Sequence, residues 1–101
     1  MKNGFKFEII HGLEDVDPDD DNIDLVVTLS DGRRFSASVF TMKNIEKLMK
    51  KDAETGEALH GKYFFCPDML IVKNLTHKNI QDTLDDLAKD ETLTLLRELE
   101  D

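Results

Sequence analysis

The sequence predicts one α+β domain over residues 1–101, with a mostly antiparallel sheet of about five strands and helices packed on one face. Two observations indicate this class. Short segments of alternating apolar and polar residues are joined by turn signals, which is typical of hairpins. Two later segments carry apolar residues at helical spacing, each after a capping threonine. The expected order of elements is β-β-β-α-β-β-α-α.

Apolar and polar residues alternate in the first 40 residues, which predicts three strands: 5–9, 23–30 and 33–40. Asp31 and Gly32 mark the turn between the second and third strands. A two-residue turn would place buried and exposed faces opposite each other. Adding Ser30 to the turn places Val27 opposite Phe35, so that the faces match. We therefore expect a type I turn followed by a left-handed glycine.

Two helices are expected, from Thr41 to about Ala53 and from Thr76 to about Lys89, with Gly56 as a turn residue after the first. Between them, apolar residues on both sides of a Pro-Asp turn predict a second hairpin that joins 63–66 to 69–72. Cys66 would then lie in a buried strand.

The end of the chain is ambiguous between helix and strand. A third helix is expected after Asp90, because Leu93, Leu96 and Leu99 form a stripe at helical spacing. The alternation of Thr and Leu over 92–95 leaves a strand possible there.

Charge limits the kind of partner. Thirteen basic and 22 acidic residues give a net charge of −9, which disfavours nucleic acid and anionic membrane surfaces. A basic protein is the natural electrostatic partner. No apolar run approaches the ~18 residues that span a bilayer, and Met1–Ile10 is too charged for a signal segment. These features predict a soluble, cytoplasmic chain that is a monomer or a weak dimer.

The negative charge is unevenly distributed. Residues 14–24 contribute −7 and residues 81–101 contribute −6, whereas residues 33–62 carry +3. If the two acidic segments lie together in the fold, they form one anionic face. The candidate partner-binding residues are Glu14, Asp15, Asp17, Asp19, Asp20, Asp21, Asp24, Asp82, Asp85 and Asp86.

No pattern predicts a cofactor, a metal or catalysis. The acids of 14–24 resemble a calcium loop in their first spacings, but Asp20 stands where such a loop needs glycine and Val26 where it needs glutamate. Cys66 could pair with His60 or His77 as nucleophile and base, although nothing in the sequence positions them together. We therefore expect a protein that is not an enzyme, with weak calcium binding or a small enzyme as the remote alternatives.

One resemblance adds to this reading and covers roughly residues 23–90. It is carried by Asp31-Gly32-Arg33-Arg34-Phe35, Phe40-Thr41, Asn44-Ile45, Leu48-Met49, Thr55-Gly56-Glu57, Gly61-Lys62-Tyr63-Phe64 and Asp68-Met69-Leu70-Ile71-Val72. These segments resemble a group of small uncharacterised bacterial proteins. In size, acidity and lack of a catalytic motif the chain is similar to immunity proteins of contact-dependent and other polymorphic toxin systems.

That similarity implies a function but transfers no functional residue. Immunity proteins bind a secreted toxin domain, often a basic nuclease, and block it. The expectation is therefore a non-catalytic acidic domain that neutralises a basic toxin domain. The alternative is a structural or regulatory module that self-associates through an exposed sheet edge or through the C-terminal leucine stripe.

Overall fold

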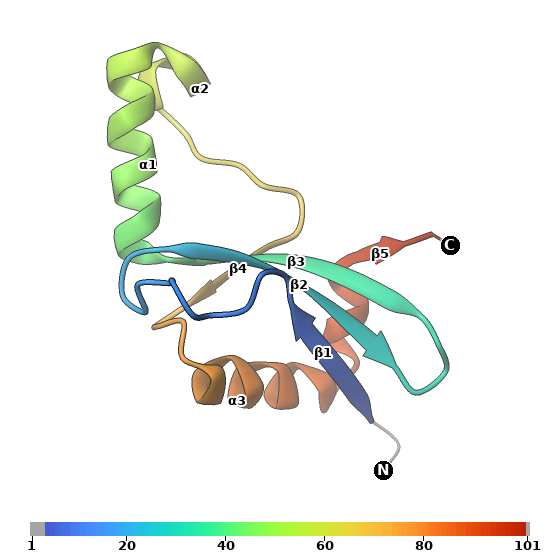
Figure 1. Ribbon diagram of the computed structural model, residues 1–101. Helices are drawn as coiled ribbons and strands as arrows, with labels where there is room; N and C mark the ends of the chain where they lie inside the picture. The colour runs from blue at the N-terminus through green and yellow to red at the C-terminus, as the bar shows by residue number, and fades with distance from the viewer. Residues whose placement is uncertain (1–3, 101) are drawn as a thin grey trace.

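The structure is a computed structural model that describes residues 4–100, and it confirms the α+β fold. This part of the chain contains one five-stranded, mostly antiparallel sheet (Figure 1). The strands are β1 (Phe5–Ile9), β2 (Asn22–Leu29), β3 (Arg34–Thr41), β4 (Met69–Val72) and β5 (Arg97–Leu99). The helices are α1 (Met42–Thr55), α2 (Glu57–Gly61), α3 (His77–Ala88) and a 3-10 helix, η1 (Thr92–Leu95).

The sheet has the strand order β1-β2-β3-β4, and β5 also pairs with β3. The predicted register of the β2–β3 hairpin is confirmed, because Val27 lies opposite Phe35. Gly32 adopts a left-handed conformation with φ of 92°, and its N–H donates to the carbonyl of Leu29 at 2.9 Å. The matched faces follow from this turn, since a slip of one residue would expose the buried side chains.

The core lies between one face of the sheet and α3 (Figure 1). Leu25 and Val27 of β2 are fully buried there, together with Ile80 and Leu84 of α3. The predicted cap is confirmed: Thr76 Oγ1 accepts a hydrogen bond from the backbone N–H of Asn79 at 3.2 Å. This bond satisfies one of the free amides at the start of α3 and fixes where the helix begins.

The prediction of a second hairpin, which joined 63–66 to 69–72, is wrong. Residues 63–66 form no strand, and β4 instead pairs with β3 in parallel. The Pro-Asp turn does form, with the N–H of Met69 donating to the carbonyl of Cys66 at 3.3 Å. Within 63–66, Phe64 packs edge-on against Phe40 with ring centroids 5.1 Å apart, whereas Tyr63 and Phe65 are exposed. Cys66 is therefore half-buried and lies outside any strand.

The end of the chain follows the strand alternative in part. Instead of a third α-helix, residues 92–95 form a short 3-10 helix that buries Leu93. The chain then enters β5, which pairs antiparallel with the first residues of β3. β5 supplies the fifth strand that the second hairpin was expected to provide.

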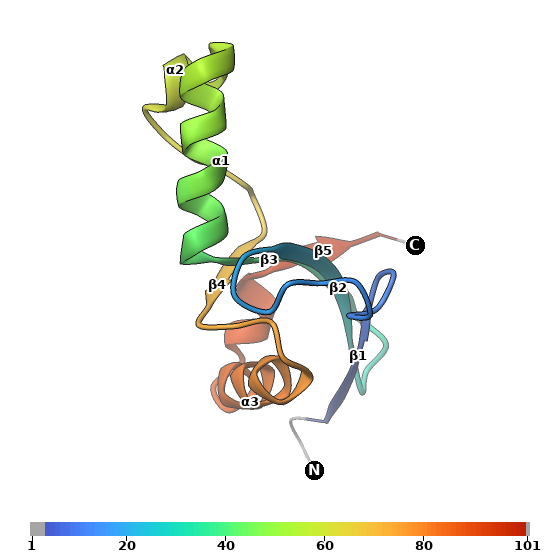
Figure 2. The same cartoon turned by 60° about the vertical axis from the view of Figure 1, so that its left-hand side comes forward.

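α1 stands away from the sheet and gives the molecule an elongated shape of 47 × 26 × 23 Å (Figure 2). Thr41 caps its start and Gly56 ends it, as predicted. We call α1, α2 and residues 62–66 the arm. At its tip Ala58, Leu59 and His60 adopt left-handed backbone angles, so that the chain reverses tightly toward the sheet. Such angles cost roughly 1 kcal/mol or more for each residue that has a side chain.

Gly61 closes this reversal and is the residue on which it depends. A Cβ at this position would lie 2.3 Å from the carbonyl oxygen of Met49 on α1. We expect Gly61→Ala to destabilise the arm by about 2 kcal/mol or more. The added methyl group would clash with the backbone of α1, and the clash can be relieved only if the chain at residue 61 and α1 move apart. Amide hydrogen exchange in the last turns of α1 measures the effect. Gly32→Ala is the matched control, since its φ is also positive but its Cβ meets nothing within 4 Å. Equal protection of α1 in both variants would contradict this account.

Candidate partner-binding site

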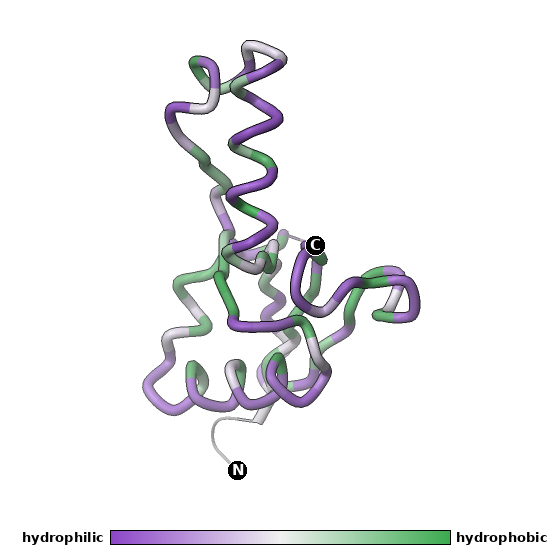
Figure 3. Tube along the Cα trace, turned by 90° about the vertical axis from the view of Figure 1, so that its left-hand side faces the viewer, coloured by the Kyte–Doolittle hydropathy of each residue, from purple (hydrophilic) through white to green (hydrophobic). Residues whose placement is uncertain are grey.

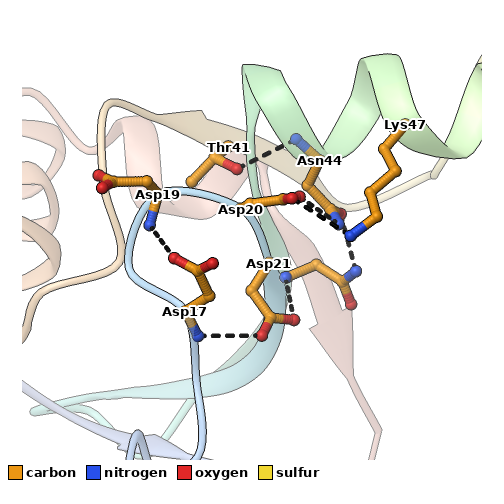
Figure 4. A network of polar contacts seen from close by, with 8 residues as sticks. Asp17, Asp19, Asp20, Asp21, Thr41, Asn44 and Lys47 are labelled. Atoms are coloured by element: carbon orange, nitrogen blue, oxygen red, sulfur yellow. Dashed lines mark hydrogen bonds and ion pairs between the residues drawn. The ribbon is translucent and has the colours of Figure 1, made fainter.

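The acidic loop, residues 14–24, covers most of the connection between β1 and β2 and the first three residues of β2, and it reaches the base of α1 (Figure 4). Asp24 therefore lies in a strand, opposite Ser38 of β3, and not in the irregular loop that the run of acids predicts. The acidic loop is anchored to the body of the domain. Leu13, just before it, and Val16 within it pack against the core. The carbonyl of Pro18 accepts a hydrogen bond from the N–H of Leu75 at 2.8 Å. The loop is therefore a fixed part of the surface.

Asp20 points inward and is held by the arm (Figure 4). Its side chain is 13% exposed, and Lys47 Nζ donates to its Oδ2 at 3.2 Å. Asn44 Nδ2 lies 3.5 Å from the other carboxylate oxygen. Burial alone would raise the pKa of Asp20, but the bonds from Lys47 and Asn44 and the nearby lysine charges outweigh it and lower that pKa. Asp20 is thus engaged within the molecule rather than offered to a partner.

Two further acids shape the loop. Asp21 accepts hydrogen bonds from the backbone N–H groups of Asp17 at 3.2 Å and Asn22 at 2.8 Å. Asp17 accepts one from the N–H of Asp19 at 3.0 Å. These short-range bonds give the loop its turns, as Asp side chains commonly do. Each carboxylate retains further acceptor positions, because it can take up to about four hydrogen bonds.

The remaining charge of the loop faces solvent. Glu14, Asp15, Asp17 and Asp19 are all exposed. Neither Glu14 nor Asp15 makes an ion pair within residues 4–100. Charges without a partner on their own chain are the ones that can attract a partner from solution.

Beside these acids lies a groove of about 340 Å³. Three carboxylates line it: Asp15, Asp21 and Asp24. Apolar Ile10 and Val16 line it as well, so that it offers negative charge beside a hydrocarbon wall. Arginine and lysine side chains have the matching form, a cationic head on an apolar stem. The groove can accept such a side chain from a partner.

The acids of α3 do not join this groove. Each has a partner on its own helix or its end: Lys78 Nζ lies 2.8 Å from Asp82, Gln81 Nε2 donates to Asp85 at 3.1 Å, and Lys89 Nζ lies 3.5 Å from Asp86. None of the three acids lines the groove. The structure therefore brings Asp15, Asp21 and Asp24 together and leaves Asp82, Asp85 and Asp86 apart from them.

Asp68 connects the arm to the sheet. The sequence predicts it only as a turn residue, but in the structure it is a buried carboxylate. Asp68 is only 9% exposed, and its two oxygens accept hydrogen bonds from Ser36 Oγ at 2.8 Å and Cys66 Sγ at 3.3 Å. Burial would raise its pKa, but the hydrogen bonds from Ser36, Cys66 and Ser38 outweigh it, so that the pKa is lowered. The sequence offered one signal of this role, namely an acidic residue within an otherwise apolar segment. Asp68 positions the entry to β4, and a carboxylate with a lowered pKa is a weak general base at neutral pH.

Within residues 4–100, no group of three or more His, Cys, Asp or Glu side chains is arranged to hold a metal ion, and this includes the acids with calcium-like spacing. In the same range no helix has the length and apolarity needed to cross a membrane.

Comparison with known proteins finds no relative: no protein-family model, no curated protein and no solved structure matches the chain. The groove and the exposed acids of the loop are therefore the observations on which a function can be proposed.

The lowered pKa of Asp68 predicts a stability effect in acid. A carboxyl whose folded-state pKa lies below its unfolded value, about 3.9, stabilises the fold above that value and loses this contribution as pH falls through the folded pKa. Asp68→Asn lacks this contribution, so its free energy of unfolding should fall less steeply below about pH 4.

Ser36→Ala is the companion variant, because it keeps the carboxylate and removes its closest donor. Removing this donor raises the folded-state pKa of Asp68 toward its unfolded value, so the acid-induced loss of stability should be smaller than in the wild type and complete at higher pH. Urea unfolding at a series of pH values measures both variants. Parallel pH profiles for the wild type and both variants would show that Asp68 is not stabilised as described.

Proposed function

We propose that this chain is a non-catalytic binding domain that captures a basic protein through the acidic loop. The groove lined by Asp15, Asp21 and Asp24 is the observation that supports this most directly. It combines three carboxylates with an apolar wall, and it receives an arginine or lysine side chain of the partner. Bidentate contact with a guanidinium gives such a site both strength and orientation.

The charges outside the groove have a separate role in this proposal. Glu14, Asp17 and Asp19 are exposed at the same loop and raise the local concentration of a cationic partner. Rim charges of this kind act mainly on the rate of association and are screened by salt. The complex should therefore form quickly and weaken as ionic strength increases.

A toxin domain is the partner that fits the resemblance found in the sequence. Proteins of that character block a basic toxin, often a nuclease, which needs a cationic surface to bind phosphates. Carboxylates held by the loop can occupy that surface in place of phosphate groups. A partner of this kind would be met in the cytoplasm, where a nuclease acts on its substrate, and the chain would need no catalytic group of its own.

Two triple variants with equal charge test the role of the loop. Asp15→Asn/Asp19→Asn/Asp24→Asn changes the loop, whereas Asp82→Asn/Asp85→Asn/Asp86→Asn changes α3. Each reduces the net charge from −9 to −6, and asparagine at 24 can still accept the hydrogen bond from Ser38. Affinity capture from a lysate of the source cell, with elution by rising salt, compares them with the wild type.

The proposal predicts that a basic protein retained by the wild type is retained by the α3 variant and lost by the loop variant. Its affinity for the loop variant should fall about tenfold or more. Equal loss in both variants would show that net charge alone drives retention. Unchanged retention by the loop variant would reject the loop as the contact.

A further inference from the structure

β4 is an outer strand of the sheet, and its edge carries no charged residue. Its pairing partner in the described sheet is β3, on one side. Its four residues, Met69-Leu70-Ile71-Val72, are all apolar. In Figure 3 the apolar stretch that includes β4 lies at the margin of the molecule. An edge of this kind presents backbone N–H and C=O groups that can pair with another strand, although the N–H of Met69 already donates to the carbonyl of Cys66.

The opposite edge of the sheet is formed by β1, and it differs from β4 because it carries charged residues. β1 carries Lys6 and Glu8 at its exposed positions, and charged side chains are a common protection against edge-to-edge pairing. β4 has no charge, proline or glycine within its length. One edge thus carries charged side chains and the other does not, so that the β4 edge is the one on which a further strand can pair.

The faces of β4 determine which register a second β4 could take. Ile71 is the neighbour of Phe40 and lies on the face away from α3, whereas Leu70 is the neighbour of the buried Val39. Antiparallel pairing with Ile71 opposite its own copy keeps like faces together. It also places Leu70 opposite Val72, so that the core continues across the contact. A two-fold axis one residue earlier, at Leu70, would instead place Asp68 opposite the buried Val72. We exclude that register because it would bury a carboxylate against an apolar side chain.

Exposed aromatic side chains precede β4 in the chain. Phe64 packs against Phe40, whereas its neighbours Tyr63 and Phe65 are exposed, Phe65 to 74%. Aromatic residues of this size supply much of the buried area at protein interfaces. Their segment leads directly into β4, so that they extend the apolar surface beyond the strand itself.

We propose that β4 pairs antiparallel with β4 of a second copy of this chain about a two-fold axis at Ile71, which joins the two sheets into one. A second copy fits because its edge offers the same four uncharged residues, so that no charge of one chain faces a charge of the other along the paired strands. A two-fold contact is self-complementary, as this register requires. This inference is independent of the acidic loop.

Sedimentation of the full chain over a wide dilution series tests the pairing. The wild type should dimerise reversibly, and Ile71→Lys should weaken the dimer about tenfold or more, because the charge would lie against its own copy. Ile71 is 46% exposed, so a lysine there can reach solvent in the monomer. Leu95→Lys is the matched control at an 83% exposed leucine outside the edge, and it should dimerise like the wild type.

The register is tested by cross-linking. In a Cys66→Ala background, Ile71→Cys should form a disulfide-linked dimer on oxidation, since opposed residues in antiparallel strands have Cα atoms about 4.5–5.5 Å apart. Leu95→Cys in the same background should not. A wild type that stays monomeric at every concentration, or an Ile71→Lys variant that dimerises like the wild type, would overturn the proposal. The loop triple variant should still dimerise, so that failure of the binding function and failure of the pairing can be told apart.

Discussion

The position of the acidic loop depends on one buried polar side chain, Asn44 in the first turn of α1. Its Oδ1 accepts a hydrogen bond from Asn22 Nδ2 at 2.8 Å, and its Nδ2 faces Asp20 (Figure 4). Its backbone N–H donates to Thr41 Oγ1 at 3.3 Å. Asn44 therefore joins the loop, the start of β2 and the start of the arm. Since a buried amide must find partners for its donors and its acceptor, it allows few other arrangements of these segments.

This joint explains how seven acids can lie within eleven residues of a folded loop. Close carboxylates repel one another, and the loop needs compensating contacts to keep its shape. Lys47 takes up the charge of Asp20, and backbone N–H groups of the loop donate to Asp17 and Asp21. The contacts fix the loop from its inner side and leave its outer side charged. A binding surface built in this way needs little reorganisation when a cationic partner arrives.

Local chemistry allowed part of this fold to be predicted from the sequence. The register at Gly32 and the caps at Thr41 and Thr76 depend on neighbouring residues and face alternation, and they were predicted correctly. The parallel pairing of β4 was missed, because the contact between Phe64 and Phe40 joins distant residues. The loop acids were identified as a group, but composition could not show that Asp20 turns inward. The burial of Asp68 was overlooked because its closest donor, Ser36, comes from β3 and is 32 residues away in the sequence.

The central claim is that the outer side of the loop is the surface that receives basic side chains. Titration of the isotope-labelled chain with a short arginine-rich peptide at low salt, followed by NMR chemical shifts, tests it most directly. The account predicts shift changes concentrated at residues 10–24 that disappear at high salt, because both the groove and the exposed acids lie there. Shift changes concentrated on α3, or the same changes at high salt, would contradict it.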